Sequence, residues 1–121
     1  MNLRVKSRRL EGGIGVVELI GEVDVYSASQ AKQTMHELVD AGANHLLVDL
    51  GSTDYLDSTA MGVLVGVLKK VAEKGGSVRL VRLRPRIRRL FEITRLDRVL
   101  PIFESEEDAL AELASQEGKD E

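Results

Sequence analysis

The feature that most constrains the fold of this 121-residue chain is a regular change in its hydrophobic period. Short, nearly continuous apolar runs alternate with longer segments in which apolar residues recur every three or four positions. The first pattern is typical of buried strands and the second of amphipathic helices. Strands that alternate with helices form mostly parallel sheets with right-handed crossovers. The sequence therefore predicts a single α/β domain.

The order of elements predicted from these periods is β-β-α-β-α-β-α-β-α. The first two strands flank "EGGIG", a hairpin-type turn signal, so the sheet should be mixed, mostly parallel, with an N-terminal antiparallel hairpin. Pro101 favours an edge position for the last strand. The predicted strands lie within residues 3–9, 14–23, 45–50, 77–83 and 99–103, and the helices within 24–42, 59–73, 84–96 and 105–116.

Capping signals define several helix ends. Ser27 and Gln30 have the spacing of a capping box at the start of the first helix, and Gly42 has the position of its C-terminal stop. Pro85 suits the first turn of the third helix. We expect residues 1–115 to form the domain and residues 116–121 to form a short acidic C-terminal tail.

Composition excludes several classes of function. The absence of cysteine excludes disulfides, thiol catalysis and cysteine-ligated zinc. A formal net charge of −3 and 3% aromatic residues argue against a nucleic-acid partner. The longest apolar run, residues 60–68, is far shorter than the roughly 20 residues of a membrane span, and no signal peptide is visible. We therefore expect a cytoplasmic protein with no membrane partner.

A short polar segment, "DST" at Asp57, Ser58 and Thr59, separates a predicted strand from a predicted helix. In the simplest interpretation Asp57 or Ser58 caps a helix that begins near Thr59, which is worth about 1 kcal/mol. A serine at a helix N-terminus is also well placed for phosphorylation, since unpaired N–H groups and the helix dipole tolerate a phosphate. The added charge, beside Asp57 and near Asp24 and Asp54, would repel a bound partner while leaving the fold intact.

The residues after this polar segment, "AMGVLVG", are small or apolar. Gly62 and Gly66 would allow another protein to approach the first turns of the helix, but they would equally allow close packing on the chain's own sheet. The sequence leaves both alternatives open.

Enzymatic chemistry is not supported by the residues available. His36 lies within a helix and His45 at a strand start, so neither is placed to activate Ser58, and no G-x-S-x-G or metal-ligand spacing occurs. Asp24, Asp49, Asp54 and Asp57 gather at strand ends, as in a two-component receiver domain, but the receiver's acidic pair after the first strand and its late lysine are both missing. We expect no enzyme activity, no metal and no cofactor.

Three stretches together resemble the STAS domain of bacterial anti-sigma factor antagonists: "LIGEVDVYSASQ", "LLVDLGSTDYLDSTAMGVLVGVLKK" and "GGSVRLVRLRPRIRRLFEITRLDRVLPIFESEEDAL". The resemblance covers about residues 3–114, with the same order of elements. Its most specific part begins at Asp57-Ser58, where the family reads D-S-[ST]-G-[LM]-G. This chain has Ala60 in place of the first glycine, Met61 within the common range, and Gly62 at the second glycine.

The resemblance implies a partner-switching regulator. The unphosphorylated form would bind an anti-sigma factor that is also a serine kinase and so release a sigma factor. Phosphorylation at Ser58, with Thr59 as a minor alternative acceptor, would dissociate the complex, and a PP2C-type phosphatase would reverse it. The implied partner surface contains Asp24, which matches the family's G-x-[IVL]-D loop, together with residues 57–62. The alternative is a STAS scaffold in a larger signalling assembly that phosphorylation does not regulate.

Eight arginines gather between residues 79 and 98 of a chain that is acidic overall. They could form a solvated surface with ion pairs to the acidic last helix, or a basic patch that steers an acidic partner. The eight are Arg79, Arg82, Arg84, Arg86, Arg88, Arg89, Arg95 and Arg98.

Overall fold

The long second strand organises the sheet. In this computed structural model, which describes residues 2–119, strand β2 (Ile14–Val23) pairs antiparallel with the whole length of β1 (Leu3–Leu10). Its mostly buried, apolar sequence is suited to a position with neighbours on both sides. On its other side it pairs in parallel with β3 (His45–Asp49). The predicted N-terminal hairpin is therefore confirmed.

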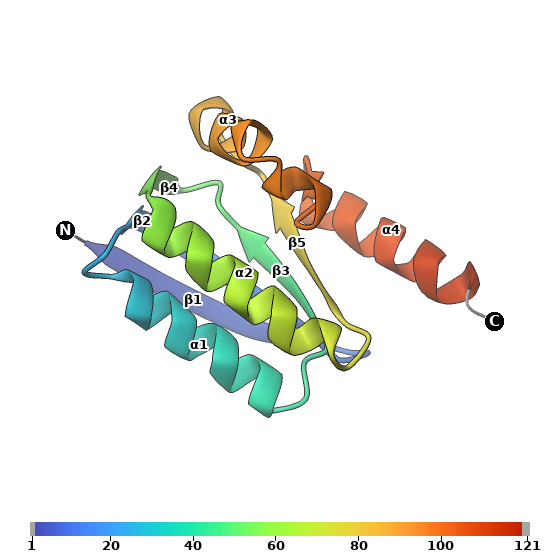
Figure 1. Cartoon of the computed structure of the whole chain (residues 1–121). Coiled ribbons are helices and arrows are strands. Elements are labelled where there is room, and N and C mark those ends of the chain that lie inside the picture. The colour runs from blue at the N-terminus through green and yellow to red at the C-terminus, as the bar shows by residue number, and fades with distance from the viewer. Residues whose placement is uncertain (1, 120–121) are drawn as a thin grey trace.

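The remaining strands extend the sheet in parallel. The order is β1-β2-β3-β5-β6, where β5 is Ser77–Val81 and β6 is the short strand Ile102–Phe103 (Figure 1). Strand β6 lies at the edge and directly follows Pro101, as predicted from the proline's missing donor. The α/β class and the mixed, mostly parallel sheet are confirmed.

A short strand missing from the sequence-based prediction is β4 (Thr53–Leu56), which pairs in parallel with the last residues of β2. Strand β2 extends beyond β3, and its pairing with β4 shifts in register between Gly21 and Glu22. Gly21 has a φ of +112°, and a Cβ there would lie 2.2 Å from the carbonyl oxygen of Asn2, so this bend needs glycine. Strand β4 ends at Leu56, directly before Asp57.

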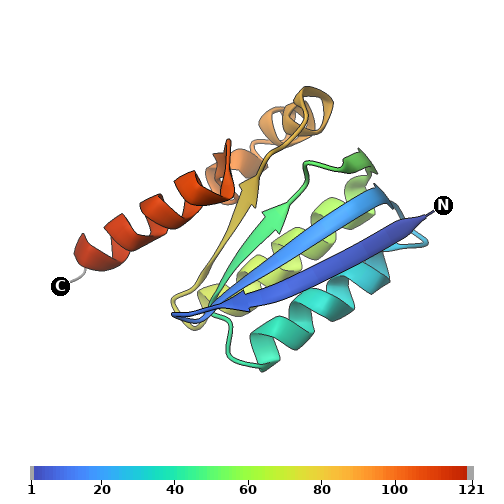
Figure 2. The same cartoon turned by 180° about the vertical axis from the view of Figure 1, so that it is seen from behind.

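The helices form layers on the two faces of the sheet. Helices α1 (Ala28–Asp40) and α2 (Ser58–Ala72) pack side by side on one face, over the main core. Helix α4 (Glu106–Lys119) lies on the other face, against β3, β5 and β6. Figure 2 shows β1 and β2 from that second face, where no helix lies in front of them. Helix α3 (Pro85–Ile93) buries Ile87 and Phe91, contacts β4, and is followed by the 3₁₀ helix η1 (Leu96–Arg98).

Two of the three predicted capping signals are confirmed. Gly42 follows α1 with a φ of +113°, and Pro85 is the first residue of α3. The capping box at Ser27 is wrong, because the Ser27 side chain makes no cap hydrogen bond and instead bonds within the preceding loop. Helix α4 runs to Lys119, into the predicted acidic tail, and positions 120–121 of that tail lie outside the described residues.

Candidate functional site

The predicted site residues meet where β2 and β4 end side by side. Val23 pairs with Leu56 at the ends of these strands, and the Asp57 N–H donates to the Val23 carbonyl over 3.2 Å. The loop after β2 and the start of α2 therefore lie next to each other at the carboxyl edge of the sheet, where α/β proteins place their sites.

The first turn of α2 exposes Ser58. Asp57 is the N-cap, and its carboxylate accepts a hydrogen bond of 3.0 Å from the Ala60 N–H. The helix begins at Ser58, so of the two predicted caps Asp57 is the one used, and the exposed Ser58 hydroxyl is not needed to cap the helix. The Met61 N–H is the first to bond back to the Asp57 carbonyl. The amides of Ser58 and Thr59 precede it and have no helical acceptor.

The small residues of α2 divide into an inner and an outer set. Ala60 is 2% exposed and belongs to the core, with Met61 partly buried against it. Gly62 and Gly66 are exposed, and a Cβ added at either position would meet no atom within 4 Å. Close packing on the chain's own sheet is therefore not their role, and of the two alternatives the structure supports the open surface.

The loop after β2 is organised by the carboxylate of Asp24. Its Oδ1 atom accepts hydrogen bonds from the N–H groups of Tyr26 (2.9 Å) and Ser27 (3.0 Å), and the Ser27 hydroxyl lies 3.1 Å away. The Ser27 hydroxyl also donates to the Glu22 carbonyl over 2.8 Å and accepts from the Asp24 N–H. Asp24 is thus buried against its own loop, and the turn it forms directs Val25 and Tyr26 into solvent.

The electrostatics of Asp24 follow from these contacts. Burial raises the pKa of its carboxyl, but the hydrogen bonds from Tyr26 and Ser27 outweigh burial, so the pKa lies below its usual value. Asp24 is therefore an anion at neutral pH, held in place by the backbone of its own loop.

Together these elements form a groove of about 320 Å³ lined by Glu22, Asp24, Val25, Tyr26, Tyr55 and Asp57. Tyr26 is 85% exposed, Val25 61% and Tyr55 51%, although side chains of this size are usually better covered. Among the side chains of residues 2–116, no basic group forms an ion pair with any of the three carboxylates of this groove. We call this surface, with the adjoining Ser58, the acidic groove.

Val25, Tyr26 and Tyr55 were not among the residues singled out from the sequence. One signal was available: the chain has only two tyrosines, and they lie next to Asp24 and Asp57 in sequence, within two residues of each aspartate. Tyrosine offers a large apolar area with a polar tip, which is why it is enriched in protein interfaces.

The other two strand-end aspartates, Asp49 and Asp54, do not line this groove, and both are paired with arginines. Asp54 lies 2.6 Å from an Arg84 nitrogen. Asp49 accepts from Arg82 over 3.1 Å and from the Gly51 N–H over 2.8 Å. Of the four acids predicted to gather at this edge, Asp24 and Asp57 line the groove together, and Asp49 and Asp54 are held by arginines.

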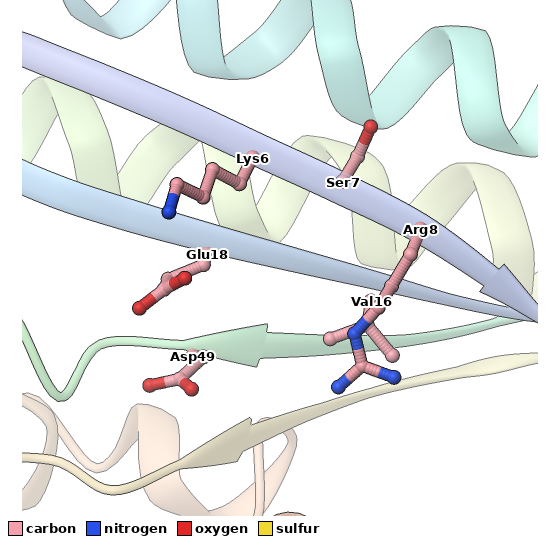
Figure 3. A pocket seen from close by; sticks show the side chains of 6 residues that line it. All are labelled: Lys6, Ser7, Arg8, Val16, Glu18 and Asp49. Carbon is pink, nitrogen blue, oxygen red and sulfur yellow. The ribbon is translucent and has the colours of Figure 1, made fainter.

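A second hollow, of about 220 Å³, lies on the opposite face of the sheet (Figure 3). Its side chains come from three neighbouring strands, with Lys6 and Arg8 on β1, Glu18 on β2 and Asp49 on β3. Here every carboxylate has a basic neighbour: Lys6 is the register partner of Glu18, and Arg82 lies 3.8 Å from Glu18 and 3.1 Å from Asp49. Arg8 pairs in turn with Glu106 of α4.

The described residues offer Ser58 no general base. His36 contacts Lys70 and His45 contacts Ser77, both at the end of the sheet and helices opposite to Ser58. Among the side chains that the structure describes, no cluster of three His, Asp or Glu could hold a metal ion. None of the helices described has the length and hydropathy to cross a membrane. What the acidic groove offers is a set of carboxylates beside exposed tyrosine and valine side chains.

The sequence and the fold of this chain are both similar to those of known proteins. The profile of the STAS domain matches residues 7–109. The chain is 40% identical over 102 residues to the anti-sigma-B factor antagonist of Bacillus subtilis, covering 84% of this chain and 92% of that protein. It is 29% identical to the anti-sigma F factor antagonist of Paenibacillus polymyxa, covering 93% and 97%. The crystal structure of an anti-sigma factor antagonist from Mycobacterium paratuberculosis matches with a TM-score of 0.82 and 25% identity, covering 91% and 92%.

Proposed function

Because this chain belongs to the STAS domain family, we propose that it is an anti-sigma factor antagonist, a binding protein that captures an anti-sigma factor and so releases a sigma factor. The relatives that carry this name match the chain over most of their own length. The single observation in the structure that supports it best is the acidic groove, whose three carboxylates have no basic partner among the described residues. The protein acts by binding and catalyses no reaction.

The groove is suited to a partner with a basic side chain at its centre. Glu22, Asp24 and Asp57 supply negative charge, and Tyr26 and Tyr55 supply aromatic faces on which a guanidinium can stack. Complementary charge at an interface speeds association and fixes orientation. The open backbone at Gly62 lets the partner reach the first turn of α2.

We propose further that Ser58 is the switch. The anti-sigma factor acts as a serine kinase and phosphorylates the exposed Ser58 hydroxyl, and a PP2C-type phosphatase removes the phosphate. The free amides at the start of α2 stabilise a phosphate there without unfolding the helix. A group carrying about −1.5 to −2 charges beside Asp57 would oppose the carboxylates of the groove, and its desolvation would weaken partner binding. Thr59, also exposed, is the minor alternative acceptor.

Ala60 replaces the glycine of the family motif without altering this surface. Its side chain packs into the core, and its N–H still bonds to the capping Asp57 carboxylate. The extra methyl group therefore lies on the inner side of α2, away from the exposed Ser58.

The test uses the anti-sigma factors with a kinase-type ATPase domain from the same genome, purified individually. Wild-type protein should bind one of them, gain one phosphate with ATP by intact mass, and then dissociate. Ser58→Ala should bind without accepting phosphate, and Ser58→Asp should bind at least tenfold more weakly. Ser115→Ala, at an exposed serine of α4 on the other face of the sheet, is the control and should behave as wild type. Tight binding by Ser58→Asp would contradict the switch, and a partner that binds with no phosphate transfer would favour the scaffold alternative.

A further inference from the structure

The eight arginines between residues 79 and 98 separate into two sets. One set is paired: Arg79 lies 2.7 Å from Glu112, Arg82 is held by Asp49, Arg84 by Asp54, and Arg88 by Glu92 and Glu104. In the other set no side chain has an ion pair or hydrogen bond to any described residue. That set is Arg86, Arg89, Arg95 and Arg98.

The unpaired arginines occupy the outer side of α3 and the turn after it. Arg86, Arg89 and Ile93 are spaced by three and four residues, so they share one side of the helix. The buried side, with Ile87 and Phe91, faces away from them. Arg95 directly precedes η1 and Arg98 is its last residue, and η1 packs against α3.

Two aliphatic side chains lie among these charges. Ile93 is 71% exposed and Val99 is 51% exposed. We call Arg86, Arg89, Ile93, Arg95, Arg98 and Val99 the arginine patch. Exposed apolar side chains surrounded by arginine are typical of protein interfaces, where both arginine and apolar residues contribute to the contact.

The arginine patch and the acidic groove lie at the same end of the molecule. Arg84, directly before α3, donates to the Gly51 carbonyl over 3.0 Å and to Asp54 of β4 over 2.6 Å. Figures 1 and 2 both show α3 at the end of the sheet where β4 leads into α2. A partner seated on the groove would therefore extend toward α3.

We propose that the arginine patch binds an acidic surface of the same anti-sigma factor that occupies the groove. The inference rests on the proposed function and names a second contact region for that partner. Because the groove is acidic and the patch is basic, a partner with the opposite arrangement binds in one orientation only. The four unpaired charges also attract that partner at a distance and raise the association rate.

Two other polyanions fit the patch less well. The chain carries a formal net charge of −3, which opposes long-range attraction to nucleic acid, and no aromatic side chain of the patch can stack on bases. An anionic membrane would need a larger apolar surface than Ile93 and Val99 provide, because the remaining apolar side of α3 is buried in the core.

The test is a kinetic measurement of wild type and charge-reversal variants with the anti-sigma factor, at low and high salt. Arg86→Glu/Arg89→Glu and Arg95→Glu/Arg98→Glu should each lower the association rate about tenfold at low salt. The decline of that rate with salt, steep for wild type, should flatten in both variants. Lys69→Glu/Lys74→Glu changes the net charge equally and should retain the wild-type rate, since Lys69 lies in the last turn of α2 and Lys74 just after it.

The outcomes separate this inference from the proposed function. If wild-type protein binds no anti-sigma factor, the proposed function fails. If it binds and both reversal variants associate at its rate, the patch inference alone is wrong. Arg86→Gln/Arg89→Gln, which removes charge without adding any, should give an intermediate rate, and thermal melting verifies that each variant is folded. Patch-dependent binding of a DNA duplex or of phosphatidylglycerol vesicles by the free protein would also overturn the inference.

Discussion

The acidic groove lies at the carboxyl edge of the sheet, and the hollow lies on the face that carries α4. Both bring together carboxylates from neighbouring segments of the chain, but the two sets differ in whether basic side chains lie beside them. In the hollow, Glu18 and Asp49 lie beside Lys6 and Arg82. In the groove, Glu22, Asp24 and Asp57 have no basic partner among residues 2–119, and exposed tyrosines adjoin them. The carboxylates of the hollow are neutralised by basic side chains of the same chain, and no described side chain does this for the carboxylates of the groove.

Under the proposed function, this difference separates a solvated face from a binding surface. Charges that are already paired at the surface offer a partner few new contacts. Such exposed pairs are themselves worth about 0–1 kcal/mol, because water and salt screen their charges. Unpaired charges beside exposed apolar side chains gain complementary contacts when a partner arrives. The arginines follow the same rule, with Arg79 and Arg82 paired inside the domain and Arg86 and Arg89 left unpaired.

The largest expected contrast is between Asp24→Ala and Asp49→Ala. Removing the Asp24 carboxylate frees the loop that holds Tyr26 outward and deletes a groove charge, so affinity for the anti-sigma factor should fall roughly 100-fold. Removing Asp49 breaks contacts with Arg82 and Gly51 and should lower the free energy of unfolding by roughly 1–3 kcal/mol, with affinity unchanged. Calorimetry and urea unfolding measure both quantities.

Asp24→Asn is the control that separates the charge from the loop geometry, since the amide oxygen can still accept the loop's hydrogen bonds. The Asp24 pKa lies below its usual value, so its charge contributes stability fully present above about pH 3.9 and lost as the pH falls through the folded-state pKa. Wild type should therefore be more stable than Asp24→Asn at pH 7, and the difference should shrink toward pH 3. Equal losses of affinity in Asp24→Ala and Asp49→Ala would remove the distinction between the two regions.

A smaller contrast is expected from truncating exposed tyrosines. Tyr26→Ala and Tyr55→Ala should each lower affinity for the anti-sigma factor about tenfold, because buried tyrosines dominate many interfaces. Both side chains are largely exposed in the free protein, so stability should change by no more than about 0.5 kcal/mol. Lys6→Ala in the hollow is the matched control and should change neither quantity. Tyrosine variants that bind as wild type would place the partner elsewhere.

Sequence periodicity predicted the layers of this fold well, because β2, β3 and β5 are apolar runs and α1 and α2 have clear helical stripes. It missed β4, in which only Thr53 and Leu56 are buried and whose partner is the far end of β2. Such pairing depends on where β3 stops relative to β2, which no local pattern records.

The site was predicted in part for a similar reason. The cap at Asp57 and the exposure of Ser58 follow from local rules for helix starts. The exposure of Tyr26 depends on how Asp24 folds the loop, and the division of the arginines depends on partners about 30 residues away, such as Asp54 for Arg84 and Glu112 for Arg79. Charge pairing of this kind becomes visible only in three dimensions.

The smallest expected effect concerns the two open glycines of α2. Gly62→Ala and Gly66→Ala should each stabilise the protein by about 0.5–1 kcal/mol, since alanine favours a helix and a Cβ at either position meets no atom within 4 Å. Gly62 lies one turn after Ser58, where the added methyl group would hold the partner away from the backbone, so affinity should fall about fivefold, which is less than 1.4 kcal/mol. Gly66, one turn further on, should show a smaller loss or none.

Urea unfolding and titration with the anti-sigma factor measure the two effects separately. A loss of stability in Gly62→Ala would show that the glycine serves the fold, and a greater loss of affinity in Gly66→Ala would move the centre of the interface along α2, away from the acidic groove.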